Sequence, residues 1–215
     1  MPPPLGVVVG LEAEARLARR WGVPVAVGGG DAAGAAKAAE HLAGLVSGLI
    51  SFGLAGGLEP GLPAGALLVP RQVRDGAEAW QTDPDLNRQL GGETGHILLG
   101  GGAVLATPQA KRAAHQAGAD AVDLESAAVA RAAARHGLPF AVLRAVCDTA
   151  ERALPLAALV ALDRAGRIGG LRIAAAVLRR PWELPALIGL AQDAARARKA
   201  LAGRVARTSL VDNRP

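Results

Sequence analysis

The hydrophobic positions of the chain follow two alternating patterns. Continuous apolar runs that contain β-branched residues predict strands at residues 5–9, 23–27, 45–52, 66–73, 97–105 and 138–147. Between most of these runs, apolar residues with a helical period predict helices at residues 11–21, 31–43, 108–117 and 124–136. Several strands are too continuously apolar to have one face in water, so helices must cover both faces of the sheet. We therefore expect an α/β fold of three layers, with a central mixed but mostly parallel sheet.

The pattern changes after residue 155, where long helical stretches replace the alternation. They are predicted at residues 155–164, 168–180 and 183–204. No internal repeat is visible, and a chain of 215 residues that is 51% hydrophobic can build one sizeable core. We therefore expect a single domain over residues 1–215, with a helical C-terminal part at residues 155–204.

The positive charge is concentrated in this C-terminal part. The net charge is +5, and residues 164–215 hold 11 Lys or Arg against 3 Asp or Glu, which leaves 13 against 16 in residues 1–163. Because the body is mildly acidic, we expect no nucleic-acid partner. A composition rich in Arg and Ala is also what a GC-rich genome would impose, which explains the basicity without any function.

The sequence also bears on the cellular compartment. The longest stretch without Asp, Glu, Lys or Arg runs from His41 to Leu58, but its five glycines, two serines and one histidine indicate a helix end, a buried strand and a turn rather than a membrane span. The single Cys147 cannot form a disulfide within the chain, and the first ten residues lack the basic segment of a secretion signal. We expect a cytoplasmic protein.

Three acidic residues follow predicted strands: Glu14, Glu125 and Asp148. Ligands bind at the carboxyl ends of parallel strands, because loops and helix N-termini converge there. The three acids therefore predict a shared pocket. Each also has a purely structural explanation, since Glu14 could favour a helix dipole, and Glu125 and Asp148 could cap the segments that follow them.

Glycines form a second signal. Gly53, Gly56 and Gly57 follow a predicted strand, where backbone amides could approach a ligand closely. The segment "VGGGDAAG" resembles a dinucleotide fingerprint, but Ser51 and Phe52 stand where a ribose-binding acid is needed, so we do not expect NAD. The four histidines lack metal-site spacing, and there is no P-loop lysine or Ser-His-Asp order. We expect no metal and no cofactor.

Three segments resemble a known family. The segments "VGLEAEA", "SFGLAGGLEPGLPAGALLVP" and "AVDLESAAVARAAARHGLPFAVLRAVCDTA" occur in the order and near the spacing of the nucleoside phosphorylase and nucleosidase superfamily. They most resemble methylthioadenosine/S-adenosylhomocysteine nucleosidases. The shortened middle and the segment "LRIAAAVLRRPWELPALIGLAQDAARARKAL" resemble the hopanoid-associated phosphorylase subfamily, which acts in bacterial hopanoid lipid biosynthesis. The superfamily resemblance covers about residues 5–150 and implies a phosphorylase/hydrolase-like fold.

This resemblance implies roles for individual residues. Asp148 would protonate N7 of the purine leaving group, Glu14 would activate the attacking water, and Glu125 would bind the ribose hydroxyls, while Asp123 supports the turn. The chemistry agrees, because purine leaves poorly unless it is protonated, and burial lets a carboxyl group keep its proton near neutral pH. The other substrate-binding positions are Leu124, Arg144, Gly53, Ala55, Gly56 and Thr107.

The chain departs from the family pattern at two positions. The small hydroxyl residue of the glycine turn is Leu54, and the residue before the catalytic aspartate, often Ser, is Cys147. The "G-D-P-x-R" type of phosphate loop is absent from the sequence. Together with Glu14, these features favour water over phosphate as the nucleophile. Phosphate stays open as a co-substrate, because arginines at positions 16, 71 or 74 could bind it.

The C-terminal part has two interpretations. Residues 168–190 combine apolar residues, Trp182 and arginines, which is similar to an interfacial helix attracted to anionic lipid. A core helix with a solvated basic edge, or an oligomer contact, explains the same pattern.

The leading hypothesis is a purine nucleosidase that releases adenine from adenosylhopane, acting as a homodimer or higher homo-oligomer with peripheral contact to the inner membrane. Phosphorolysis of the same bond is one alternative. A catalytically silent nucleoside-binding protein at the membrane surface is another, because Leu54 and Cys147 remove hydrogen-bonding capacity near the site.

Overall fold

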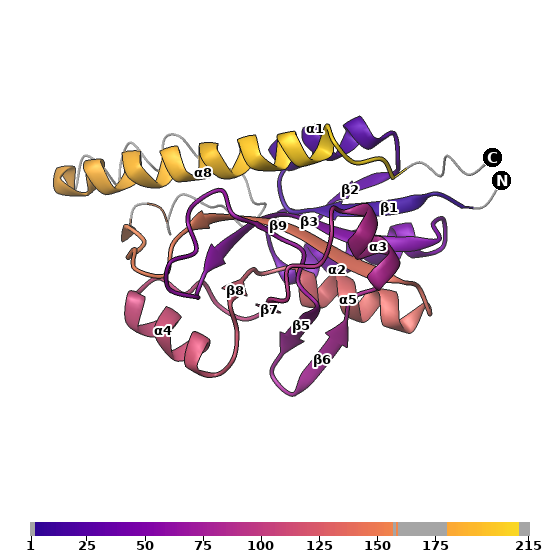
Figure 1. The fold of residues 1–215 in the computed structure, drawn as a ribbon, viewed down its shortest axis with the longest axis horizontal. Helices are drawn as coiled ribbons and strands as arrows, with labels where there is room; N and C mark the ends of the chain where they lie inside the picture. The colour runs from indigo at the N-terminus through magenta and orange to yellow at the C-terminus, as the bar shows by residue number, and fades with distance from the viewer. Residues whose placement is uncertain (1–2, 157, 159–179, 211–215) are drawn as a thin grey trace.

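The computed structural model describes residues 3–156, 158 and 180–210 of the 215-residue chain (Figure 1). The predicted helix 168–180 lies outside these residues except for its last position, as does most of the predicted helix 155–164. In the described part of the chain, no helix is long and apolar enough to cross a membrane.

The described strands form one branched sheet of nine strands. Its main path runs in the order β2-β1-β3-β8-β7-β5-β6, and β9 lies beside this path, paired with β3 and β4. Five of the strand pairs are parallel and three are antiparallel, so the sheet is mixed and mostly parallel, as predicted. The strands are β1 (Leu5–Val9), β2 (Val25–Val27), β3 (Gly48–Gly57), β4 (Leu67–Leu68), β5 (Gln72–Asp75), β6 (Glu78–Gln81), β7 (Ile97–Leu99), β8 (Ala121–Val122) and β9 (Phe140–Asp148).

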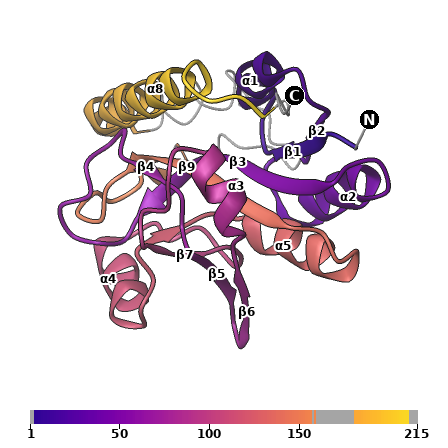
Figure 2. The same ribbon diagram turned by 45° about the vertical axis from the view of Figure 1, so that its right-hand side comes forward.

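Helices cover both faces of this sheet, which gives the three predicted layers (Figure 1, Figure 2). Side chains of α2 and α5 form one hydrophobic core with the sheet, and side chains of α1, α3 and α8 form the other. Neighbouring residues of β1 enter opposite cores, Val8 the first and Val7 the second, because side chains alternate along a strand. The helices are α1 (Glu12–Ala18), α2 (Ala32–Ala43), α3 (Pro84–Gln89), α4 (Pro108–Gln116), α5 (Ser126–Arg135) and α8 (Leu184–Val205), with short 3-10 turns at Arg19–Trp21 and Pro181–Glu183.

The pairing of β3 with β9 positions the site. The register places Gly53 opposite Arg144 and Gly56 opposite Asp148, and a bulge interrupts the pairing between Ala55 and Gly56. The carboxyl ends of β1, β3 and β9 therefore lie at one edge of the sheet, since these three strands are parallel.

The structure differs from the predicted elements in the middle of the chain. The strand expected at residues 66–73 is two short strands, β4 and β5, and the strand expected at 97–105 ends at Leu99. The chain cannot continue β7 past that point, because it turns through Gly100–Gly102, and Gly102 is left-handed with φ 91°. The elements β6, α3 and β8 were not predicted from the sequence, and all three are short.

Candidate active site

A cavity of about 490 Å³ lies at the carboxyl ends of β3 and β9, beside the starts of α1 and α5; we call it the central cavity. Glu14, Glu125 and Asp148, which are far apart in the sequence, all line it, so the structure brings the three acids together around one space. A volume of this size falls in the range of small-molecule sites. Other lining residues are Gly10, Leu11, Leu54, Ala55, Gly56, Asp123, Leu124, Arg144 and Cys147.

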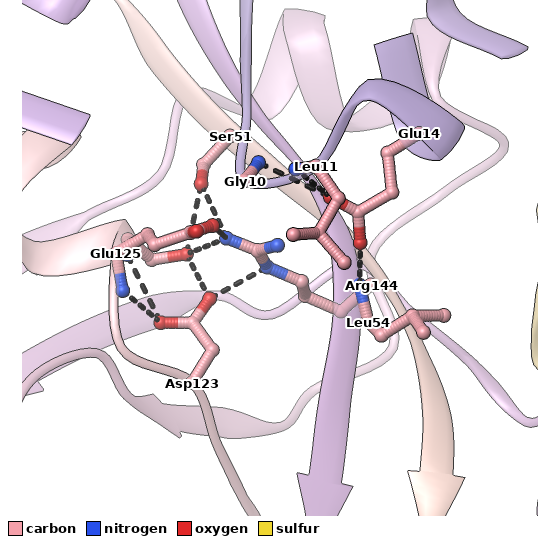
Figure 3. A network of polar contacts seen from close by, with 9 residues as sticks. Gly10, Leu11, Glu14, Ser51, Leu54, Asp123, Glu125 and Arg144 are labelled. Atoms are coloured by element: carbon pink, nitrogen blue, oxygen red, sulfur yellow. Dashed lines mark hydrogen bonds and ion pairs between the residues drawn. The ribbon is translucent and has the colours of Figure 1, made fainter. Parts of the chain in front are cut away.

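Arg144 of β9 is the centre of a buried polar network (Figure 3). It is 1% exposed, and its Nη2 atom donates to Oγ of Ser51 at 2.7 Å and to Oγ of Ser126 at 3.1 Å. Nη2 also lies 3.4 Å from Oε2 of Glu125, and Nε lies 2.6 Å from Oδ2 of Asp123. Burial acts to lower the pKa of Arg144, but the surrounding carboxylates raise it above its ordinary value, so the guanidinium stays charged.

Asp123 and Glu125 have different surroundings although they are two positions apart. Oδ1 of Asp123 accepts hydrogen bonds from the backbone N–H groups of Glu125 at 3.1 Å and Ser126 at 2.9 Å, so Asp123 supports the turn into α5. Glu125 makes no capping hydrogen bond with its side chain, which lies at the cavity beside Arg144. Burial, opposed by Arg144 and helped by the charges of Glu14 and Asp123, raises the pKa of Glu125 to about 7.

Glu14 is held in the first turn of α1 by backbone donors. Its Oε2 atom accepts from the N–H groups of Gly10 at 3.1 Å and Leu11 at 2.9 Å, and its Oε1 atom accepts from the N–H of Leu54 at 3.1 Å. Burial raises the pKa of Glu14, and Arg144 and the three amides oppose this. The carboxyl group is therefore fixed between the end of β1 and β3, and Glu14 lines the cavity.

Two glycines let these charged groups lie against the backbone. A Cβ atom at Gly53 would overlap Nη1 of Arg144 and lie 2.7 Å from Oε1 of Glu14. A Cβ atom at Gly10 would overlap the carboxylate of Glu125. Gly53 thus packs against Arg144 and Glu14 and is not among the residues that line the cavity, so its binding to substrate stays a prediction.

Asp148 is paired with a lysine that the sequence analysis did not identify. Nζ of Lys111, in α4, donates to Oδ1 of Asp148 at 2.7 Å and to the backbone carbonyl oxygens of Thr149 at 2.7 Å and Arg152 at 2.9 Å. Burial raises the pKa of Asp148, and the hydrogen bond and charge of Lys111, followed by Arg152, oppose that rise.

The structure places the remaining predicted residues as follows. Ala55, Gly56 and Leu124 line the central cavity. Thr107 is not among the lining residues; its Oγ1 atom caps the first turn of α4 instead. In the described residues, no group of three or more His, Cys, Asp and Glu side chains is arranged to hold a metal ion.

One side of the cavity is apolar. Leu11 and Leu54 contribute to it near the acids, and further aliphatic side chains come from the segment before α4, the segment after β9 and helix α8. These are Val104, Leu105, Leu154, Leu187, Leu190, Ala191 and Ala194. The cavity therefore combines a charged end with a larger apolar end, as a site for an amphiphilic ligand would.

The chain is similar to one protein family over most of its length. The family profile described as "Phosphorylase superfamily" matches residues 22–178, which is well over half of the chain. The chain belongs to the phosphorylase superfamily. It is an enzyme of the nucleosidase or nucleoside phosphorylase type. No curated protein matches this sequence.

Solved structures of bacterial proteins have a fold similar to that of this chain. An MTAN mutant of Helicobacter pylori with 5'-methylthioadenosine in its active site aligns with a TM-score of 0.66 at 17% identity, covering 96% of this chain and 100% of that one. The Neisseria meningitidis 5'-methylthioadenosine/S-adenosylhomocysteine nucleosidase in complex with methylthio-immucillin-A gives 0.64 at 18%, covering 94% and 98%. A futalosine hydrolase mutant of H. pylori gives 0.64 at 16%, covering 81% and 98%. At these identities the likeness is one of fold.

Several residues of this phosphorylase-superfamily site escaped the sequence analysis. Lys111 is one of only three lysines among 24 basic residues, which is the one signal that could have drawn attention to it. Ser51 lies in an apolar stretch and Ser126 directly follows Glu125, and their contacts with Arg144 join three separate elements. The apolar wall from α8 follows from tertiary packing, which no local pattern encodes.

Proposed function

We propose that this enzyme cleaves the N-ribosidic bond of a purine nucleoside by hydrolysis, and that it releases adenine from adenosylhopane. The observation that carries the proposal is the position of three carboxyl groups, Glu14, Glu125 and Asp148, on one cavity whose volume falls in the range of small-molecule sites. The chemistry of this bond asks for an acid at the base, a general base for water and an acceptor for the ribose hydroxyls.

Each carboxyl group suits one of these tasks. Asp148, whose pKa burial raises, would give its proton to N7 of the purine as the bond between C1′ and N9 breaks and its electron pair passes to the base. Glu14 would take a proton from water as the water oxygen bonds to C1′. Glu125 would accept hydrogen bonds from the two ribose hydroxyls, which strengthen when its carboxyl group is ionised.

Hydrolysis is favoured over phosphorolysis by the charges around the nucleophile. Glu14 and Glu125 would repel a phosphate ion, and Arg144 already faces carboxylates. The arginines at positions 16, 71 and 74 do not line the cavity, whereas Arg198 of α8 does. Arg198 is therefore the residue on which phosphorolysis, as the alternative reaction, would depend.

The apolar end of the cavity supports a nucleoside with a large apolar 5′-substituent. Leu187 and Leu190 of α8 face this space together with Leu105 and Leu154. A hopane skeleton buries far more apolar surface than the methylthio group of a smaller nucleoside, and each buried methylene group contributes about 0.8 kcal/mol. The apolar hopane skeleton of adenosylhopane would therefore bind against these aliphatic side chains.

The test is the release of adenine, measured by chromatography after incubation of the purified chain with adenosylhopane. Asp148→Asn should lose nearly all of this activity, while Asp85→Asn, which changes an exposed carboxylate on α3, should keep it. Omitting phosphate leaves the rate unchanged if water is the nucleophile and abolishes it in phosphorolysis. Full activity of Asp148→Asn would refute the acid assignment. Adenine binding without turnover of any nucleoside would instead favour a silent binding protein.

Peripheral contact with the membrane is a second part of the proposal. The 3-10 turn before α8 exposes Trp182 (72%), and the start of α8 exposes Leu184 (45%) and Ile188 (50%). The same helix lines the cavity through Leu187. An exposed apolar patch next to the cavity would let a lipid substrate pass from the bilayer to the site. Trp182→Ser should reduce flotation with anionic vesicles without affecting cleavage of soluble adenosine. Equal flotation of the native chain and the variant would exclude a contact of Trp182 with the membrane.

The oligomeric state rests on the family resemblance alone, from which we propose at least a homodimer. Sedimentation equilibrium of the purified chain measures its mass in solution, and a monomer at micromolar concentration would rule the dimer out.

A further inference from the structure

Lys111 is the most deeply buried charge beside the central cavity, and it has no role in the reaction proposed above. Its side chain is 0% exposed, although lysine is among the residues least often found fully buried. Its ammonium group has three acceptors within 2.9 Å: Oδ1 of Asp148 and the carbonyl oxygens of Thr149 and Arg152. All three N–H donors of the ammonium are therefore satisfied.

This arrangement divides the two oxygen atoms of Asp148 between two partners. Oδ1 accepts from Lys111, whereas Oδ2 faces Gly56, because a Cβ atom at Gly56 would lie 3.3 Å from it. Gly56 and Asp148 both line the central cavity. The proton that Asp148 would donate to a purine therefore belongs on Oδ2, the oxygen that the lysine leaves uncovered.

We infer that Lys111 is a positioning residue for the proton donor: it holds Asp148 with Oδ2 towards the leaving group and stabilises the carboxylate that forms when the proton has been given up. This inference rests on the proposed function, in which Asp148 is the general acid. When the proton passes from Oδ2 to N7, the carboxylate left behind forms an ion pair with the ammonium of Lys111, at 2.7 Å in the resting structure. Without Lys111 the same step would leave an unpaired charge in a buried place.

Lys111 also fixes the backbone that follows β9. Its bonds to the carbonyl oxygens of Thr149 and Arg152 join α4 to residues 149–152, and the N–H of Leu154 donates to the carbonyl oxygen of Ala106 at 2.8 Å beside them. The hydrogen bonds between residues 106–111 and residues 148–154 thus hold both Asp148 and Leu154, which line the cavity.

The other titratable groups near Asp148 are either paired with each other or uncharged near neutral pH. Arg152 follows it in the chain and is paired with Asp193 of α8 at 2.8 Å, and their effects on the pKa of Asp148 oppose each other. Burial raises the pKa of the adjacent Cys147 thiol to about 12, so it is uncharged near neutral pH. Lys111 is therefore the charge whose removal should alter the titration of Asp148 most.

The experiment compares Lys111→Gln with Lys37→Gln, a control at an exposed lysine of α2. The carboxyl carbon of Asp148, labelled with ¹³C and assigned through Asp148→Asn, is titrated by NMR in the native chain and both variants. Lys111→Gln should raise the pKa of Asp148, because the opposing charge is gone, and Lys37→Gln should leave it unchanged. An unchanged titration in Lys111→Gln overturns the inference, whether or not any nucleoside is cleaved.

Kinetics then test the effect on proton donation. Lys111→Gln should lower kcat for adenine release by roughly 10- to 100-fold, and the alkaline limb of the pH profile of kcat/KM should move to higher pH. Cleavage of p-nitrophenyl riboside, whose leaving group needs no proton, should change by less than about threefold, which shows that the variant is folded. A native kcat and pH profile in Lys111→Gln would refute the inference while the proposed function stands. If the native chain cleaves no nucleoside, the proposed function fails, and the catalytic role of Lys111 fails with it.

Discussion

Nε of Arg144 lies 2.6 Å from Oδ2 of Asp123, so the acid that supports the turn into α5 is also paired with the arginine in the middle of β9. The same guanidinium interacts with Glu125 and Glu14. One buried cation therefore balances three carboxyl groups, each of which would be unfavourable at this depth without it.

Replacing Arg144 should consequently destabilise the protein more than any other single change in the site. Arg144→Met leaves Asp123, Glu125 and Glu14 buried without a counter-charge, and we expect a loss of about 3–5 kcal/mol in the free energy of unfolding. Urea denaturation at neutral pH measures it, with Arg20→Gln at an exposed position as the control. A loss similar to that of the control would mean that the network contributes little to stability.

Glu125 should make the stability of the protein depend on pH. Its pKa is raised from 4.5 to about 7 in the folded chain, so the folded state binds its proton more tightly than the unfolded state. This contribution to stability is complete below pH 4.5 and is lost as the pH rises through about 7.

The difference in unfolding free energy between the native chain and Glu125→Gln should therefore fall steadily over that range, and it is measured by urea denaturation at several pH values. Glu93→Gln, at an exposed position, serves as the control. A difference independent of pH would contradict the raised pKa.

Much of the fold could be predicted because continuous burial leaves a clear pattern. The strands β1 and β9 and the helices α2, α4 and α5 lie within two residues of the predicted bounds at each end. Helix α8 was also expected, at residues 183–204, and it spans Leu184–Val205. The strand β8 could not be predicted, since Ala121–Val122 is a strand only because it pairs with β3 and β7.

The candidate site also contains residues that could be predicted from the sequence and residues that could not. That acids at strand ends would meet around one cavity follows from the topology of a parallel sheet, so the positions of Glu14, Glu125 and Asp148 could be inferred from the sequence. The contact between Lys111 and Asp148 joins residues 37 positions apart on different elements. It depends on how α4 docks, and the hydrophobic pattern of a helix does not determine which polar group its lysine will meet.

A methyl group at position 10 should disturb the site with little effect on the rest of the fold. In Gly10→Ala the new Cβ atom would overlap the carboxylate of Glu125, which must then leave the position in which it is proposed to bind ribose. We expect weaker nucleoside binding, measured by calorimetry, and a destabilisation of about 1–3 kcal/mol from overpacking. Gly44→Ala is the control, because nothing lies within 4 Å of its added Cβ atom and its φ is −76°. Native affinity in Gly10→Ala would show that Glu125 tolerates displacement.

The apolar wall of α8 should determine preference for the 5′-substituent and leave the chemistry of the bond unchanged. Leu190→Gln puts an amide among the aliphatic side chains of the cavity and leaves unchanged the three acids proposed to act on base and ribose. Since a buried leucine contributes about 1.5–3 kcal/mol, we expect kcat/KM for adenosylhopane to fall roughly 10- to 100-fold. The value for adenosine should change little, because adenosine lacks the apolar 5′-substituent that is proposed to contact this wall. Leu45→Gln, at a 59% exposed position after α2, controls for general effects of the substitution. Equal losses for both substrates would show that the effect of the wall does not depend on the 5′-substituent, and would remove the ground for a lipid-linked nucleoside.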